Sequence, residues 1–69
     1  MNENYNIDRE IRKYELIVLR LKKIKELGLI LEGKDLRYKN NMNSYTFIED
    51  VKRNLKMEKD LLEDLLTEE

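Results

Sequence analysis

The chain contains no proline, and its only two glycines, Gly28 and Gly33, both fall near the middle of its 69 residues. Proline interrupts a helix more strongly than any other residue, and glycine is the next most disruptive. Nothing therefore prevents a long helix before Gly28 and another after Gly33. We expect a mainly α-helical, single domain over residues 1–69, with two long amphipathic antiparallel helices joined by a structured linker.

Apolar side chains before Gly28 recur in alternating steps of four and three residues, which is the spacing of one helix face. They are Ile7, Ile11, Tyr14, Val18 and Leu21, and Ile17 and Ile24 widen the stripe. Asn6 or Asp8 is a candidate cap for the start of this helix, and Gly28 is a candidate end. We place the first helix at about residues 7–27.

The second helix opens with a candidate capping box, Thr46 followed by Glu49, and Ser44 is the competing cap. We place this helix at about residues 46–66. Its apolar stripe consists of Ile48, Val51, Leu55, Leu62 and Leu65. Glu58 falls inside the stripe, where it either fixes the register of a partner or extends its charged end to solvent.

The linker, residues 28–45, is long for a connection without structure of its own. One possibility is a short β-hairpin, in which residues 29–31 and 36–38 flank a tight turn at a glycine. The alternative is a short helix at about 34–42 or an irregular loop. Residues 40–44 are polar and are expected to form a turn into the second helix.

The net charge of -1 conceals an asymmetry. Residues 7–27 carry seven basic and four acidic side chains, whereas residues 47–69 carry four basic and eight acidic ones. This distribution favours antiparallel pairing of the helices. In that arrangement we expect Arg20 and Lys23 to approach the acidic pair Glu49–Asp50.

A chain this short buries a small share of its surface and usually needs disulfides, a metal or oligomerisation for stability. The absence of cysteine and histidine removes the first route and the usual metal ligands, so we expect a homodimer that forms a four-helix bundle. The residues expected in the core or dimer interface are Ile11, Val18, Leu21, Val51, Leu55 and Leu62.

Several apolar residues lie off the two stripes, and the hairpin alone has too few partners to cover them. Leu16 and Leu19 lie on the first helix, and Met57 and Leu61 lie on the second. We expect such residues and neighbouring charges to contact a target protein. The predicted target-binding residues are Leu16, Leu19, Arg20, Lys23, Arg37 and Tyr38.

Catalysis is not expected, because there is no histidine base, no cysteine nucleophile and no glycine-rich phosphate loop, and the sole serine is Ser44. We also expect no cofactor. The leading hypothesis is a small regulator or inhibitor that occludes or recruits a target protein. An abundance of Asn, Lys and Ile is typical of AT-rich genomes and is compatible with a phage or mobile-element origin.

Two other roles remain open. Basic side chains on one side of the first helix, together with Arg37-Tyr38-Lys39, could bind nucleic acid, although the pI near 5.5 opposes this. The chain could also be a structural or scaffold component. The polar N-terminus and the short apolar runs lead us to expect a cytoplasmic protein without a membrane segment.

Overall fold

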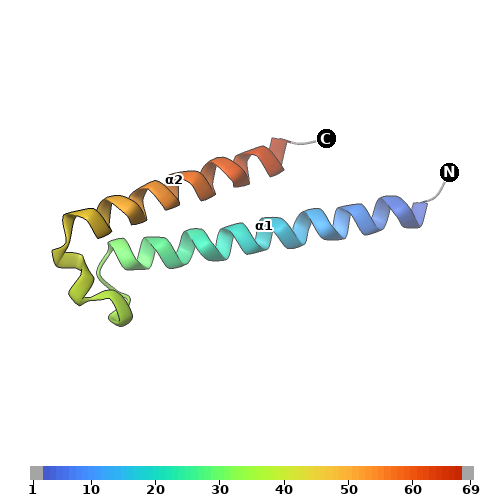
Figure 1. The fold of residues 1–69 in the computed structure, drawn as a ribbon. Helices are drawn as coiled ribbons and strands as arrows, with labels where there is room; N and C mark the ends of the chain where they lie inside the picture. Colours follow the sequence, from blue (N-terminus) through green and yellow to red (C-terminus); the bar gives the residue numbers. More distant parts are fainter. Residues whose placement is uncertain (1–2, 68–69) are drawn as a thin grey trace.

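Two helices lie side by side in antiparallel orientation and make up most of the protein (Figure 1). The computed structural model describes the backbone of residues 3–67 and the side chains of residues 6–67. The elements are α1 (Glu3–Leu31), the 3-10 helices η1 (Leu36–Tyr38) and η2 (Asn40–Asn43), and α2 (Tyr45–Thr67). The expected pair of antiparallel helices is confirmed.

The hairpin is long and thin, with extents of 56 × 19 × 12 Å. Its radius of gyration is 16.1 Å, whereas a compact chain of this length would have a radius of about 11 Å. The N-terminal part of α1 extends past the end of α2 (Figure 1). Among the residues with described side chains, only Ile17, Ile30, Val51 and Glu58 are buried. A single chain therefore has a very small core.

Helix α1 is longer at both ends than the expected range of 7–27. Asn6 and Asp8 lie within the helix and do not cap it, and Gly28 does not end it. Glycine inside a helix costs about 1 kcal/mol relative to alanine. Continuing past Gly28 places Ile30 in a buried position, and burial of one such side chain gains about 1.5–3 kcal/mol. Packing therefore outweighs the local preference of glycine.

The second glycine ends α1. Gly33 has a φ of 74°, which is the left-handed conformation that glycine adopts without steric cost. The Gly33 N–H donates to the Ile30 carbonyl over 3.0 Å, and the Lys34 N–H donates to the Leu29 carbonyl over 2.9 Å. These two bonds form a Schellman motif, which satisfies carbonyl groups that the end of a helix leaves unpaired.

The β-hairpin alternative for the linker is wrong, because none of residues 3–67 forms a strand. Residues 29–31, expected as one strand of that hairpin, belong to α1. The other half begins at Asp35, whose carboxylate accepts the Arg37 N–H over 3.0 Å and starts η1. An aspartate that bonds the backbone two residues ahead favours a tight turn over a strand. The other alternative was one short helix at about 34–42 or an irregular loop, and the linker instead contains two 3-10 helices, η1 and η2.

Helix α2 is capped by Ser44, the competing candidate. The Phe47 N–H donates to the Ser44 Oγ over 3.2 Å, which is the bond of an N-cap residue. Thr46 lies inside the first turn, so the expected capping box with Glu49 does not begin the helix. The helix therefore starts one residue earlier than expected, at Tyr45.

The contact between α1 and α2, here called the seam, repeats every three and four residues on both helices. Its α2 side consists of the expected stripe with Glu58 included. Its α1 side carries buried or half-buried residues at Lys13, Ile17, Arg20, Ile24, Leu27 and Leu31. Antiparallel helices with matching three- and four-residue spacings pack side chains between one another along their length.

An ion pair crosses the middle of the seam. Arg20 Nη1 donates to Glu58 Oε1 over 2.9 Å, and the two side chains are 24% and 9% exposed. The Arg20 Nε atom is enclosed and has no hydrogen-bond partner in the described part of the chain. Glu58 is thus paired inside the seam, and of the two roles considered for it, the extension of its charge to solvent is not observed.

The expected approach of Arg20 and Lys23 to Glu49 and Asp50 is wrong. Because Arg20 lies opposite Glu58, antiparallel geometry places Glu49 about two and a half turns further along the hairpin. Glu49 pairs instead with Lys52 over 3.5 Å, and Asp50 pairs with Arg53 over 3.0 Å, both within α2.

Replacing each of the two glycines by alanine should change the free energy of unfolding in opposite directions. Gly33→Ala should lower the free energy of unfolding by about 1–2 kcal/mol, because alanine is strained in the left-handed conformation. Gly28→Ala should raise it by about 0.5–1 kcal/mol, because an added Cβ meets no atom within 4 Å and alanine favours a helix. Urea denaturation at one fixed protein concentration measures both. Equal effects of the two changes would contradict these assignments.

A second prediction concerns the ion pair in the seam. Glu58→Gln should lower the free energy of unfolding by about 1–3 kcal/mol, because it leaves the Arg20 charge partly buried without its counter-charge. The double change Arg20→Met with Glu58→Leu should recover most of this loss. Asp60→Asn is the matched control, since Asp60 pairs with Lys56 on the exposed side of α2 and its loss should cost at most about 0.5 kcal/mol. A loss as large in the control would show that the position in the seam is irrelevant.

Candidate protein-binding surfaces

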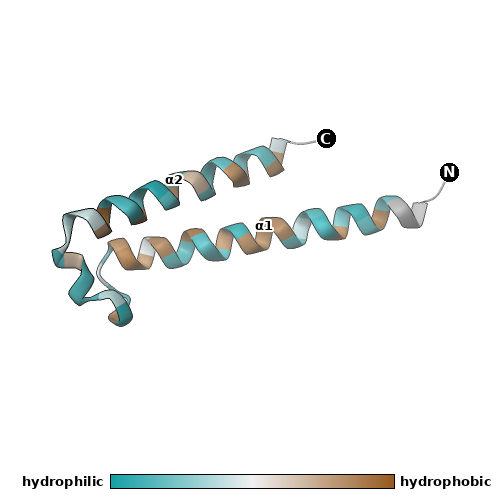
Figure 2. Cartoon of the chain, in the orientation of Figure 1, coloured by the Kyte–Doolittle hydropathy of each residue, from teal (hydrophilic) through white to brown (hydrophobic). Residues whose placement is uncertain are grey.

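Helix α1 carries two lengthwise apolar stripes with the same spacing. The first is the α1 side of the seam. The second, here called the outer stripe, consists of Ile7, Ile11, Tyr14, Val18 and Leu21, and it is rotated by about a third of a turn from the seam. Figure 2 shows that hydrophobic residues continue along α1 into the part that extends past α2.

The outer stripe is exposed along its whole length. Its five side chains are between 48% and 57% exposed, and together with Asn6, Glu10 and Glu15 four of them line an open surface depression. Three residues expected in the core or dimer interface, Ile11, Val18 and Leu21, belong to this stripe and have no place in the seam. The other three, Val51, Leu55 and Leu62, lie in the seam of a single chain.

There is a physical reason why the sequence alone did not show which of the two stripes packs on α2. Both follow the same steps of four and three, but the outer stripe is uniformly apolar, whereas the seam includes Lys13 and Arg20. A search for the most apolar face therefore finds the outer stripe first. The seam residue Glu58 on α2 was the available signal, because a buried acid requires a basic partner on the facing helix.

A second apolar surface lies on the other side of the hairpin, where both helices contribute. Leu16 and Arg20 from α1 and Leu61, Asp64 and Leu65 from α2 line an open groove, here called the leucine groove. Leu16 is 38% exposed and Leu61 is 36% exposed. The lining of the groove therefore combines three leucines with one basic and one acidic side chain.

The structure divides the six predicted target-binding residues between two places. Leu16 and Arg20 line the leucine groove, and Leu19 and Lys23 are exposed at positions i+3 and i+7 from Leu16, on the same side of α1. Arg20 is also committed to the ion pair with Glu58. The remaining two, Arg37 and Tyr38, lie in the connection between the helices, at one end of the hairpin (Figure 1).

Arg37 and Tyr38 form a packed cluster with Asp35 and Phe47, here called the elbow cluster. The Tyr38 and Phe47 rings stack with centroids 5.7 Å apart, and the Arg37 guanidinium lies 5.4 Å from the centre of the Tyr38 ring. Asp35 accepts Arg37 Nε over 3.1 Å and Arg37 Nη2 over 2.8 Å. These contacts join η1 to the start of α2.

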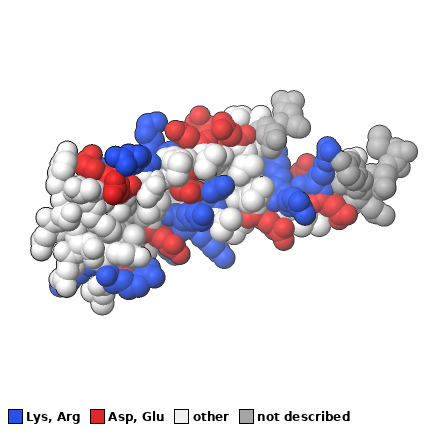
Figure 3. Space-filling view, in the orientation of Figure 1, with Lys and Arg blue, Asp and Glu red and all other residues white. Residues whose placement is uncertain are grey.

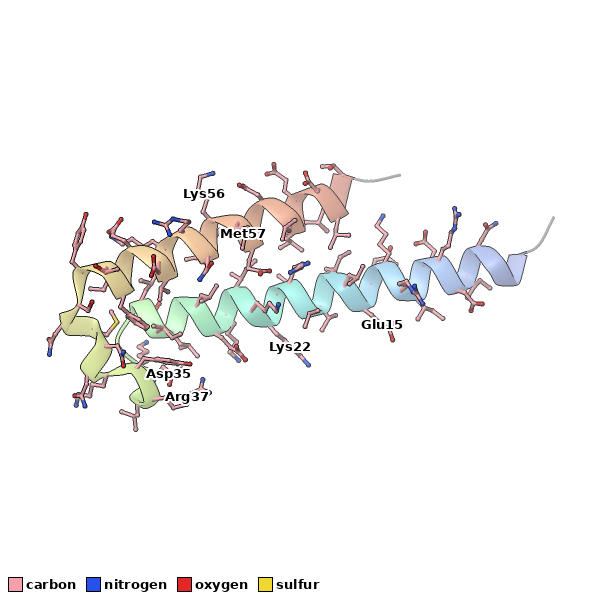
Figure 4. The ribbon with its side chains drawn as sticks, in the orientation of Figure 1. Glu15, Lys22, Asp35, Arg37, Lys56 and Met57 are labelled. Atoms are coloured by element: carbon pink, nitrogen blue, oxygen red, sulfur yellow. The ribbon has the colours of Figure 1, made fainter. Side chains whose placement is uncertain are left out.

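Electrostatic attraction between Asp35 and Arg37 also stabilises the elbow cluster. The side-chain hydrogen bonds from Arg37 hold the pKa of the Asp35 carboxyl below its ordinary value, and the same bonds raise the pKa of Arg37. Figure 4 shows the two side chains together at the connection. Sequence reasoning did not single out Asp35, although an aspartate shortly after a glycine is a turn signal, because its carboxylate can accept a backbone N–H two residues ahead.

On the face drawn in Figure 3, the described Lys and Arg side chains are interspersed with Asp and Glu. Among the residues with described side chains, no three acids are arranged to hold a metal ion. Neither helix, over its described residues, combines the length and apolar character needed to cross a membrane.

The elbow cluster predicts a pH dependence. Because the pKa of Asp35 is lowered by folding, its stabilising contribution is fully present above the unfolded value of about 3.9 and disappears as the pH falls through the lower folded value. A carbon-detected NMR titration should show the Asp35 carboxyl protonating at lower pH than a model aspartate. Asp35→Asn should remove this contribution to the pH dependence of stability, whereas Asp50→Asn should retain it. If the Asp35 carboxyl instead protonated at the same pH as a model aspartate, the Asp35–Arg37 interaction would be refuted.

Comparisons with known proteins place the chain in no family: no family model matches it, and neither a curated protein nor a solved structure does so.

Proposed function

We propose that this protein is a small protein-binding regulator, which acts by docking a target protein and thereby occluding or recruiting it. The observation that carries the proposal is the leucine groove, where exposed leucines from both helices meet beside Arg20 and Asp64. Apolar patches with a polar rim are typical of protein-binding sites. A target helix with apolar residues at i, i+3 and i+7 fits such a groove.

Dimerisation is part of the same proposal. The outer stripe and the leucine groove lie on different sides of α1, so one surface is available for a second chain while the other meets a target. The very small core of a single hairpin supports this division, because small chains without disulfides commonly gain stability by association.

A nucleic-acid-binding role receives less support. Arg20, one of the basic side chains of the first helix, is already paired with Glu58, and Arg37 is paired with Asp35. Binding to DNA or RNA that weakens steeply as salt is raised would favour that role over ours. Assembly into particles larger than a dimer would favour a structural role.

The test of the groove uses matched aspartate substitutions. Leu16→Asp and Leu61→Asp should each weaken the binding of a target at least tenfold, because a charge would be buried in the contact. Leu66→Asp is the control, since Leu66 is 60% exposed and does not line the groove. Partners captured from cells that make the protein are purified, and their affinity for each variant is measured by calorimetry.

Circular dichroism must show that each variant keeps its helices, and Leu16→Ala provides a milder change at the same position. A partner that binds the wild-type protein, Leu16→Asp and Leu61→Asp equally well would overturn the assignment of the groove. Equal loss with Leu66→Asp would show that any added charge is disruptive.

A further inference from the structure

The outer stripe of α1 is an unoccupied helix face with the pattern of a coiled-coil seam. Its five residues fall at alternating steps of four and three, which are the d and a positions of a heptad repeat, beginning with Ile7 at d. We propose that a second copy of this chain occupies the outer stripe, with the two α1 helices packed against each other in antiparallel orientation. This inference rests on the dimer included in the proposed function and identifies its interface.

The surface area of the chain is consistent with a missing partner. The accessible surface is 5934 Å², whereas a folded monomer of 8.4 kDa would expose about 4,600 Å². The excess is about 1,300 Å² per chain on the same scaling. If two chains each buried half of it, the interface would reach the lower end of the size of stable protein interfaces, about 1,200–2,000 Å².

Charges flanking the outer stripe select the second copy and its orientation. Glu10 lies at a g position, and Asp8, Glu15 and Lys22 lie at e positions. In Figure 4, Glu15 and Lys22 point to the side of α1 away from α2. Among the described residues, Asp8, Glu15 and Lys22 form no ion pair within the chain. They are therefore available to a partner helix.

A parallel dimer would place like charges together. In that orientation a g residue faces the e residue five positions later on the other helix, so Glu10 would face Glu15 of the second copy on both sides. An antiparallel dimer pairs e with e instead. When Tyr14 packs against Val18 of the second copy, Asp8 lies beside its Lys22, and the symmetric pair forms as well. The remaining contact, between the two Glu15 residues, is repulsive but occurs once.

This geometry also leaves the proposed target site open. The twofold axis of an antiparallel pair places both α2 helices on the same side of the α1 pair, toward the g positions that already pack on α2. The leucine groove lies on the far side of the seam from the outer stripe. The dimer would therefore present two leucine grooves. A target with two binding segments could occupy both and would bind more tightly than a target with one.

The interface is tested by the dissociation constant of the dimer, measured by analytical ultracentrifugation over a dilution series. Val18→Asp should raise this constant at least a hundredfold, because it places charges inside the contact, while the helices remain because Val18 has no part in the seam. Met57→Asp is the control, since Met57 on α2 is 51% exposed, close to the 48% of Val18, but lies off the outer stripe. Its dissociation constant should be unchanged.

The orientation is tested by exchanging charges. Lys22→Glu should raise the dissociation constant about two- to thirtyfold, because two attractive pairs become repulsive. Adding Asp8→Lys to the same chain should restore the affinity. In a parallel dimer these positions would lie about 21 Å apart along the helix, and no restoration would occur.

Spin labels give an independent measurement of orientation. The chain has no cysteine, so Tyr45→Cys, at a residue that is 77% exposed, introduces a single labelling site next to the elbow cluster. With Tyr14 against Val18, the two Leu31 residues lie about 45 Å apart along the dimer, so the labels should be at least that far apart. A separation below about 30 Å would indicate a parallel dimer and overturn the proposed orientation.

The outcomes separate this inference from the proposed function. A protein that stays monomeric at millimolar concentration would refute both the interface and the dimer, but target binding through Leu16 and Leu61 would still stand. A dimer lost in Met57→Asp and kept in Val18→Asp would refute the outer stripe alone.

Discussion

The structure depends on the antiparallel contact between α1 and α2 and on the ion pair at its centre. Arg20 and Glu58 meet over 2.9 Å inside a seam that is otherwise mostly apolar. A charge in such a place is costly unless its partner is opposite, so the pair permits one register and disfavours those shifted by a turn. That register decides which α1 residues lie under α2, and thereby which residues remain outside.

The consequence for function is a division of α1 into three sides. One side packs on α2, one side carries the uniformly apolar outer stripe, and one side contributes Leu16 to the leucine groove. Because a helix pair has few layers, a residue that leaves the seam is exposed and does not enter a second layer of core. The surplus of apolar surface therefore follows from the architecture, and it supports the proposal of binding. At the connection between the two helices, the elbow cluster is held together by ring stacking and by the Asp35–Arg37 ion pair.

The sequence by itself determined the two helices, the break between them and the stripe on α2, because these follow from local properties. Proline is absent, a glycine in left-handed conformation ends a helix, and three- and four-residue spacing places side chains on one face. It also indicated that the chain has more apolar residues than one hairpin covers. The sequence did not show which glycine, Gly28 or Gly33, ends α1. Glycine inside a helix is unfavourable, which is visible in the sequence, but the burial of Ile30 that outweighs this cost is visible only in the structure.

Only the tertiary structure decided which stripe of α1 faces α2. Both stripes have the same period, and the seam contains Lys13 and Arg20, whose charges lower its apolar character in any reading of a single helix. Their suitability for the seam depends on what lies across it: Glu58 in the case of Arg20, a residue 38 positions away in the chain. The energy of a buried charge is a property of a pair, so it is fixed when the two helices meet and not before.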